Sequence, residues 1–307
     1  MIKSVVVGGA GFIGSNVVDL LIEKNHEVVV VDNLSTGKAE NINPEAEFLP
    51  LDIAASNNTE VILELRRAFH GADTVYHLAA LPRVEPSIIN PTESHKINVD
   101  GTYNVFWAAK LENIKRVVFS SSSSIYGNAS CPTPEFHAKI PMSPYALQKL
   151  INEQYAELFC SLYGMNISCL RYFNVYGHRE PTEGSYVPVI GIWLRQWRLG
   201  LPLTITGNGT QSRDFVNVLD VARANILAAE KAPPGYSCYN VGSGTSKTLN
   251  SIASLISSNI EYLPPRIEPS YTLAMINKIE TELGWKSEIS LEKYLLEEME
   301  GKSNENT

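Results

Sequence analysis

The chain has 307 residues and a formal net charge of −8, and 44% of its residues are hydrophobic while 19% are charged. The net negative charge and the lack of a block rich in lysine or arginine argue against nucleic acid as a partner. No apolar run is long enough to span a bilayer, so we expect no membrane partner.

Cysteine and histidine usage narrows the class further. The four cysteines are scattered without disulfide or metal-ligand spacing, which suits a cytoplasmic protein. The six histidines form no i,i+4 pair and no cluster with cysteine, so we predict no metal site. The first strand pattern begins at residue 2, and we therefore expect no signal peptide. The length allows one large α/β domain or two closely joined ones.

The first 32 residues form one pattern. Residues 2–7 are an apolar run typical of a buried strand, Phe12–Leu21 has helical spacing, and Val28–Val31 is a second strand that ends on Asp32. Between the first strand and the helix lie three glycines in the frame G-x-x-G-x-x-G, namely Gly8, Gly11 and Gly14. Glycines there let the backbone approach a pyrophosphate at the helix N-terminus.

Asp32 follows the last of these glycines by 18 residues, where a carboxylate can accept hydrogen bonds from an adenosine ribose. A carboxylate also repels a 2′-phosphate, so the pattern favours NAD over NADP. A plain tight turn could use the same glycines, and Asp32 could be an ordinary turn residue. The strand, helix and acid together favour a dinucleotide site.

Apolar, β-branched runs then alternate with helical patterns. The expected strands are Glu47–Leu51, Thr74–Leu78, Arg116–Ser120 and Asn166–Arg171. The expected helices are Thr59–Phe69, Thr92–Leu111 and Pro144–Tyr163. This alternation predicts a doubly wound parallel sheet, in which ligands bind at the carboxyl ends of the strands.

The sequence pattern changes near Val175, after which proline and glycine residues separate shorter elements. We expect residues 1–175 to form the dinucleotide-binding domain, with parts of 214–241 returning to it, and residues 176–307 to form a smaller α/β substrate lobe. The helices expected in the second part are Val187–Leu199, Val218–Lys231 and Thr248–Ser257. The polar tail Glu297–Thr307 is expected to fray.

Tyr145 and Lys149 carry the sharpest chemical signal. Ser143 suits an N-cap and Pro144 the first helical turn, so the two side chains share one face near a helix N-terminus. A tyrosine has a pKa of about 10, and a nearby ammonium, the helix dipole and an oxidised nicotinamide would each favour its phenolate. A shift of about 3 units needs roughly 4 kcal/mol.

A Tyr-x-x-x-Lys spacing arises by chance about 0.6 times in a chain of this composition, so the spacing alone proves little. A serine run strengthens the interpretation. Ser120–Ser124 follows the buried strand ending at Phe119 and precedes an apolar turn, which is unusual for a flexible linker. A hydroxyl at this sheet edge could hydrogen-bond an oxygen that gains or loses a proton.

Together these motifs resemble the extended short-chain dehydrogenase/reductase family over nearly the whole chain. The resemblance also includes His77-Leu78-Ala79-Ala80, Asn98-Val99-Asp100-Gly101-Thr102 and Arg171-Tyr172-Phe173-Asn174. It implies a Rossmann fold that binds NAD. The catalytic residues would be Ser122, Tyr145 and Lys149. The NAD-binding residues would be Gly8, Gly11, Phe12, Ile13, Gly14, Asp32, Asn33, Ser35, Thr36, Gly37, Asp52, Ile53, Leu78, Ala79, Ala80, Asn98, Ser120, Tyr145, Lys149 and Tyr172.

By this resemblance Tyr145 would be the general base and Lys149 would also hold the nicotinamide ribose. Asp52 and Ile53 would meet the adenine, and Asn98 would lie behind the active site. Sugar-nucleotide 4,6-dehydratases of the family carry Thr-Asp-Glu in the serine loop, because elimination of water needs an acid and a base. Decarboxylases of the family keep the glutamate. The corresponding positions here are all serine, which favours oxidation and reduction alone.

The second part of the chain resembles UDP-sugar 4-epimerases of the UDP-glucose and UDP-N-acetylglucosamine type. The substrate-binding residues would be Arg83, Ser122, Ser124, Asn174, Tyr186, Val187, Arg213, Arg266 and Thr272. Thr272 stands where some 4-epimerases have a bulky tyrosine, and a small residue leaves room for a 2-acetamido group. Thr272 could instead be a plain loop residue if the alignment is off by one position.

The resemblance therefore implies an NAD-dependent UDP-hexose 4-epimerase that inverts C4 through a 4-keto intermediate and accepts or prefers N-acetylated sugars. The alternatives are a UDP-uronate 4-epimerase, another nucleotide-sugar oxidoreductase, or a non-catalytic NAD-sensing protein. The family also implies a homodimer, paired through Thr92–Leu111 and Pro144–Tyr163. The apolar positions of these helices could equally belong to the core.

Overall fold

A computed structural model describes residues 2–82, 84–183, 187–265 and 269–301. Its centre is a seven-stranded sheet whose neighbouring strands are all parallel, in the order β10-β6-β5-β4-β1-β2-β3. The strands are β1 (Lys3–Val7), β2 (Glu27–Asp32), β3 (Glu47–Pro50), β4 (Thr74–His77), β5 (Arg116–Ser122), β6 (Ile167–Tyr172) and β10 (Tyr236–Val241). The predicted doubly wound α/β fold is confirmed.

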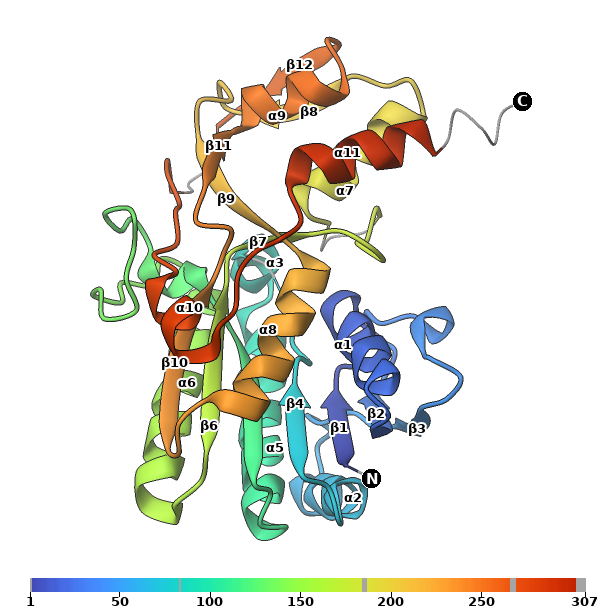
Figure 1. Cartoon of the computed structure of the whole chain (residues 1–307), viewed down its shortest axis with the longest axis vertical. Helices are drawn as coiled ribbons and strands as arrows, with labels where there is room; N and C mark the ends of the chain where they lie inside the picture. Colours follow the sequence, from blue (N-terminus) through green and yellow to red (C-terminus); the bar gives the residue numbers. More distant parts are fainter. Residues whose placement is uncertain (1, 83, 184–186, 266–268, 302–307) are drawn as a thin grey trace.

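Helices cover both faces of this sheet (Figure 1). One face packs against α1 (Phe12–Glu23), α8 (Val218–Lys231) and α10 (Asn277–Leu283). The other packs against α2 (Asn58–Phe69), α5 (Gly101–Leu111) and α6 (Pro144–Tyr163). Successive valines of β1 and β2 alternate between these two cores, which explains why both strands are almost continuously apolar.

The predicted helix Thr92–Leu111 is helical throughout, but a π-helical turn that was not predicted lies within it. α4 (Pro91–His95) is followed by a π-helical turn, η2 (Lys96–Asp100), and then by α5. The carbonyl of Asn98, inside the π turn, accepts side-chain hydrogen bonds from Thr102 at 2.7 Å and Asn152 at 2.8 Å. These side-chain donors replace regular helical bonding and stabilise the wider turn. A short helix, α3 (Val84–Ile89), precedes α4.

The C-terminal part has a third core beyond the carboxyl edge of the main sheet, in the upper part of Figure 1. Its helices are α7 (Val189–Arg198), α9 (Leu249–Ile256) and α11 (Leu291–Glu300). Its strands form a three-stranded sheet, with β9 (Ser212–Asn217) between β11 (Ser246–Thr248) and β7 (Asn174–Tyr176), and a parallel pair, β8 (Leu203–Thr206) and β12 (Ile260–Leu263). Two 3-10 turns, η1 (Ala39–Asn41) and η3 (Ser123–Tyr126), complete the described elements of the chain.

The expectation that the tail frays from Glu297 is wrong for residues 297–300, because α11 continues to Glu300. Ser290 caps this helix by accepting a hydrogen bond from the backbone N–H of Lys293. Leu291 and Leu295 are buried in the third core and fix the helix there. Within the described part of the chain, no helix is both long enough and apolar enough to cross a membrane.

Candidate active site

The glycine turn leaves the start of α1 open. Gly8 has a φ of +88°, and a Cβ atom there would overlap the backbone of Ala79. A Cβ at Gly14 would overlap the carbonyl of Gly8. Gly11 is the N-cap of α1, where no side chain caps the first amides and no acidic residue occupies the first turn. These N–H groups and the positive end of the helix dipole suit a pyrophosphate.

Asp32 lies beside this turn at the end of β2. Its Oδ2 accepts a hydrogen bond from the N–H of Ala10 at 3.0 Å, and its Oδ1 accepts one from Leu34 at 2.8 Å. A carboxylate has about four acceptor positions, so ribose hydroxyls can still bind. The next predicted NAD residues follow in a largely exposed turn, namely Asn33, Ser35, Thr36 and Gly37.

The predicted adenine contacts lie after β3. Asp52 is exposed and accepts a hydrogen bond from the N–H of Ala54 at 2.9 Å, while Ile53 is buried. The carbonyl of Ile53 accepts a hydrogen bond from Asn104 of α5 at 2.9 Å. The sequence analysis did not identify Asn104. A single asparagine within a helix has no sequence spacing that relates it to the turn at Ile53.

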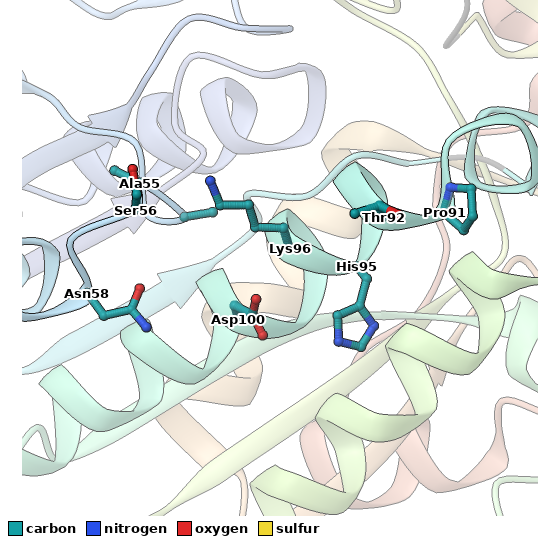
Figure 2. A pocket seen from close by; sticks show the side chains of 9 residues that line it. Ala55, Ser56, Asn58, Pro91, Thr92, His95, Lys96 and Asp100 are labelled. Carbon is teal, nitrogen blue, oxygen red and sulfur yellow. The ribbon is translucent and has the colours of Figure 1, made fainter.

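A cavity of about 680 Å³ lies next to this turn, between the loop before α2 and the helices α4 and η2 (Figure 2). It is lined by Ala54, Ala55, Ser56, Asn58, Pro91, Thr92, His95, Lys96 and Asp100. None of these residues is among the predicted NAD or sugar contacts. The cavity is therefore separate from the glycine turn and the serine loop, where the chemistry is expected.

The loop after β4 is fixed to the glycine turn. The backbone N–H groups of Leu78 and Ala79 both donate to the carbonyl of Val7, at 2.8 and 2.9 Å. Asn98 then holds the loop at Leu81, because its Oδ1 accepts from the N–H of Leu81 and its Nδ2 donates to the carbonyl of the same residue. Asn98 is 1% exposed, so it supports this loop from behind.

The three predicted catalytic residues come from β5 and α6. Ser122 ends β5, and its Oγ accepts hydrogen bonds from the backbone N–H of Ser124 at 3.2 Å and from the Ser124 hydroxyl at 2.9 Å. Tyr145 and Lys149 occupy the first turns of α6, which Ser143 caps as predicted. The Lys149 Nζ donates to the carbonyl of Ser120 at 2.6 Å and lies 5.9 Å from the centre of the Tyr145 ring. The lysine therefore links the tyrosine to the serine loop.

Tyr172 lies beside Ser122 in the register of β5 and β6, but its hydroxyl donates to Asn225 of α8 at 2.9 Å. Burial raises the pKa of this hydroxyl, which keeps it neutral. Because its proton goes to Asn225, the Tyr172 hydroxyl can only accept a hydrogen bond from a cofactor.

Three predicted sugar contacts meet around β9. Arg213 lies on that strand and is 8% exposed. Asn174 donates from Nδ2 to the carbonyl of the next residue, Asp214, at 2.8 Å, and the Thr272 Oγ1 accepts from the N–H of Asp214 at 3.3 Å. Val187 lies apart from this group, partly exposed just before α7. Arg83, Tyr186 and Arg266 lie outside the described residues.

Comparisons with known proteins identify the family of this chain. Residues 4–242 match the model of the NAD dependent epimerase/dehydratase family. A UDP-glucose 4-epimerase of Mycolicibacterium smegmatis is 33% identical over 303 residues, which cover 94% of this chain and 95% of that protein. The chain belongs to the NAD-dependent epimerase/dehydratase family. It is an isomerase of the UDP-sugar 4-epimerase type that uses NAD.

Two solved structures share the whole epimerase fold. The UDP-glucose 4-epimerase of Thermotoga maritima, solved with UDP-glucose, is 35% identical, with a TM-score of 0.92 and full coverage of both chains. A UDP-N-acetylglucosamine 4-epimerase of Methanobrevibacter ruminantium, solved with UDP-N-acetylmuramic acid, is also 35% identical, with a TM-score of 0.90 and 99% coverage of both chains. The predicted family and cofactor are confirmed.

Lys149 is a buried amine in the candidate site. Its side chain is buried, and burial lowers the pKa of its ammonium to about 7, although the Glu153 carboxylate one turn later opposes that shift. His77, also fully buried nearby, has its pKa lowered to about 3 by burial, so it is neutral. Its Nε2 lies 2.9 Å from the hydroxyl of Thr102, whose proton goes to Asn98, which makes His77 the donor.

A buried ion pair under the serine loop was not predicted. Arg171 of β6 donates to both oxygens of Glu153 in α6, at 2.8 and 2.6 Å. The Ser121 hydroxyl, next to Ser122, donates to the same carboxylate at 2.6 Å. Arg171 also donates to the Tyr126 hydroxyl of η3 at 2.6 Å. Glu153 lies four residues after Lys149, so helical spacing could have indicated it, but its arginine partner was visible only as part of a motif.

Proposed function

We propose that this enzyme interconverts UDP-hexoses at C4, and that it accepts or prefers N-acetylated sugars. The observation that carries the proposal is the position of Lys149 on α6, which donates to the carbonyl of Ser120 in the serine loop and lies 5.9 Å from the centre of the Tyr145 ring. Ser122 follows in the same loop at the end of β5. The serine loop has hydroxyls at positions 122–124 and supplies no acid or base for elimination. Oxidation and reduction at C4 need only one group to move a proton.

The residues then have distinct tasks. When bound, NAD would supply the hydride acceptor and donor for the sugar carbon. The Tyr145 phenolate takes the proton of the 4-hydroxyl and later gives it back, while the Lys149 ammonium stabilises the phenolate. Ser122 accepts two hydrogen bonds from Ser124, so its own proton can be donated to the C4 oxygen. Arg213 would hold the diphosphate through its planar fork.

Inversion requires that the sugar turn over while the nucleotide stays bound. We assign nucleotide binding to the region around β9 and sugar oxidation to the ends of β5 and α6. This assignment keeps the division predicted from the sequence, with residues 1–175 and parts of 214–241 binding NAD and residues 176–307 binding the UDP-sugar. The small side chain of Thr272, held beside Asp214, supports room for a 2-acetamido group.

The proposed enzyme is a homodimer. Helices α5 and α6 carry an aromatic cluster made of Tyr103, Trp107, Tyr155, Phe159 and Tyr163. Tyr103 is 37% exposed and Tyr163 is 45% exposed, while Leu162 beside it on α6 is 62% exposed. An apolar surface of this kind, on the helices that the family resemblance singles out, supports pairing between two copies.

Product analysis by NMR tests the proposal. The protein is incubated separately with UDP-glucose and UDP-N-acetylglucosamine, and Tyr145→Phe is run as the matched control. We expect both sugars to form their C4 epimers, and we expect the variant to be slower by about 10²–10⁴-fold because the general base is lost. Conversion of neither sugar would contradict the proposal. Conversion of UDP-glucose alone would contradict the argument from Thr272.

A further inference from the structure

Asp214 is a buried acid on β9 that joins three distant segments of the chain. Its Oδ1 accepts from the backbone N–H of Ser243 at 2.6 Å and from the hydroxyl of Ser243 at 2.8 Å. Its Oδ2 accepts from the N–H groups of Gly244 at 3.1 Å and Ala274 at 3.0 Å. One carboxylate thus holds the loop after β10 and the segment around Ala274 against β9.

The backbone of the same residue touches two of the predicted sugar contacts. Its N–H donates to the Thr272 Oγ1, and its carbonyl accepts from Asn174. Arg213 precedes it on the strand, and successive side chains of a strand point to opposite faces. Asn174 and Thr272 therefore meet at the backbone of Asp214, next to Arg213 on the strand.

Little free space surrounds the Asp214 carboxylate. A Cβ atom on Gly242 would lie 2.7 Å from the Asp214 Oδ2 and 2.7 Å from the Cβ of Ala274. Burial raises the pKa of Asp214 to about 6 although four hydrogen bonds oppose that shift. An asparagine here would turn an NH₂ group toward N–H donors and lose acceptors.

A second buried acid offers a comparison. Asp220 of α8 is also fully buried, and its Oδ2 accepts from the hydroxyl of Ser287 at 3.0 Å and from the N–H groups of Glu288 and Ile289, both at 3.1 Å. It holds the segment before α11, which contains none of the predicted sugar contacts. Asp220 resembles Asp214 in accepting hydrogen bonds from backbone N–H groups and a serine hydroxyl, but it also forms an ion pair with Arg223, and its site has no expected role in binding.

We propose that Asp214 is a positioning residue for the UDP-sugar site, which sets the affinity for the substrate by holding the segment with Thr272 and the loop 243–244 at a fixed distance from Arg213. This inference rests on the proposed function. Asp214 acts through its neighbours and does not touch the substrate.

Calorimetric titration of the NAD-loaded protein with UDP-glucose and UDP-N-acetylglucosamine tests this role. The variants are Asp214→Asn, Gly242→Ala, which crowds the carboxylate but keeps it, and the control Asp220→Asn. We expect Kd to rise at least 10-fold in the first two variants and less than 3-fold in the control. KM should follow Kd, while kcat and NAD content stay within about 3-fold of the parent, because the hydrogen bonds of Asp214 go to Asn174, Ser243, Gly244, Thr272 and Ala274 rather than to Ser122, Tyr145 or Lys149.

The two aspartate variants should lose comparable thermal stability, so a purely structural role predicts equal effects on binding. Parent-like affinity in Asp214→Asn would overturn the inference, as would equal weakening in Asp220→Asn. If Asp214→Asn does not fold, Gly242→Ala decides the question by the same criterion. If the parent protein binds neither sugar nucleotide, the proposed function itself fails and the inference falls with it.

Discussion

The two ends of the active site are built on different physical principles. At the NAD end, Gly8 and Gly14 are required because backbone atoms occupy the space where a side chain would lie. At the sugar end, the predicted contacts Asn174 and Thr272 bond to the backbone of Asp214, and its buried carboxylate holds the neighbouring segments at Ser243, Gly244 and Ala274. The first arrangement constrains residue identity along a short segment. The second joins residues that are up to 60 positions apart.

This difference shows that the two ends should respond differently to substitution. At the glycine turn, one substitution is enough to disrupt the backbone conformation, because the added methyl group cannot be accommodated. Substitution of a buried carboxylate releases the segments bonded to it one at a time, because each N–H or O–H donor can bind another acceptor or water. The predictions below test this comparison, beginning with the largest expected effect.

Gly14→Ala should abolish NAD binding. The new methyl group would overlap the Gly8 carbonyl, so the turn must open and the start of α1 must move. We expect at least a 100-fold weaker affinity for NAD, measured by cofactor content and titration. Gly200→Ala is the control, because Gly200 also has a positive φ, of +67°, but open space around it. Retention of NAD in Gly14→Ala would show that the turn tolerates a side chain.

Glu153→Ala should destabilise the fold and disturb the serine loop. It leaves Arg171 buried without its carboxylate, which costs about 3–5 kcal/mol, and frees the Ser121 hydroxyl next to Ser122. Glu157→Ala, one turn later on the exposed side of α6, should change the free energy of unfolding by less than about 0.5 kcal/mol. Denaturant titration measures both, and equal stability of the two variants would contradict a role for the buried pair.

Thr272→Tyr should change the choice between sugars. A tyrosine fills the space proposed for the 2-acetamido group, so the ratio of kcat/KM for UDP-N-acetylglucosamine to that for UDP-glucose should fall by about 10–200-fold. Thr272→Ser keeps a small side chain and its Oγ, and should leave the ratio within about 3-fold. An unchanged ratio in the tyrosine variant would place the acetamido group elsewhere.

Lys149→Met should abolish activity yet stabilise the NAD-free protein at pH 7. Burial lowers the folded-state pKa of this lysine to about 7, whereas the unfolded chain has its ordinary value near 10.5. The parent therefore gains stability as the pH rises from 7 toward 10.5, since the unfolded state then binds more protons. The advantage of the variant, roughly 1–3 kcal/mol at pH 7 after loss of the bond to Ser120, should shrink over that range. Denaturation at several pH values measures this trend, and a growing advantage would contradict it.

The sequence reveals the main sheet and the catalytic elements well, for physical reasons visible in particular residues. Strands such as β1 and β2 are buried on both faces and are therefore continuously apolar, and α6 begins with a clear cap at Ser143. Both ends of α8 match the prediction Val218–Lys231. The glycine spacing and the position of Asp32 could be related to NAD because they lie within one short segment.

Other elements could not be predicted because their burial depends on distant partners. All six residues of β9 are buried, yet Ser212, Arg213 and Asp214 are polar and are accommodated by segments far along the chain. The strand β10 has the same character, since Asn240 is buried and bonds the carbonyls of Thr133 and Met275. The π-helical turn at Asn98 likewise depends on Asn152, 54 residues away.

The central claim is that Tyr145 moves one proton while the hydride leaves C4 and returns to the same carbon. The most direct measurement uses UDP-glucose carrying deuterium at C4, with NMR analysis of the epimer in the presence of added unlabelled NAD. We predict that the deuterium stays at C4 of the product and does not pass to the added NAD. Loss of deuterium to solvent or to the added cofactor would contradict the account.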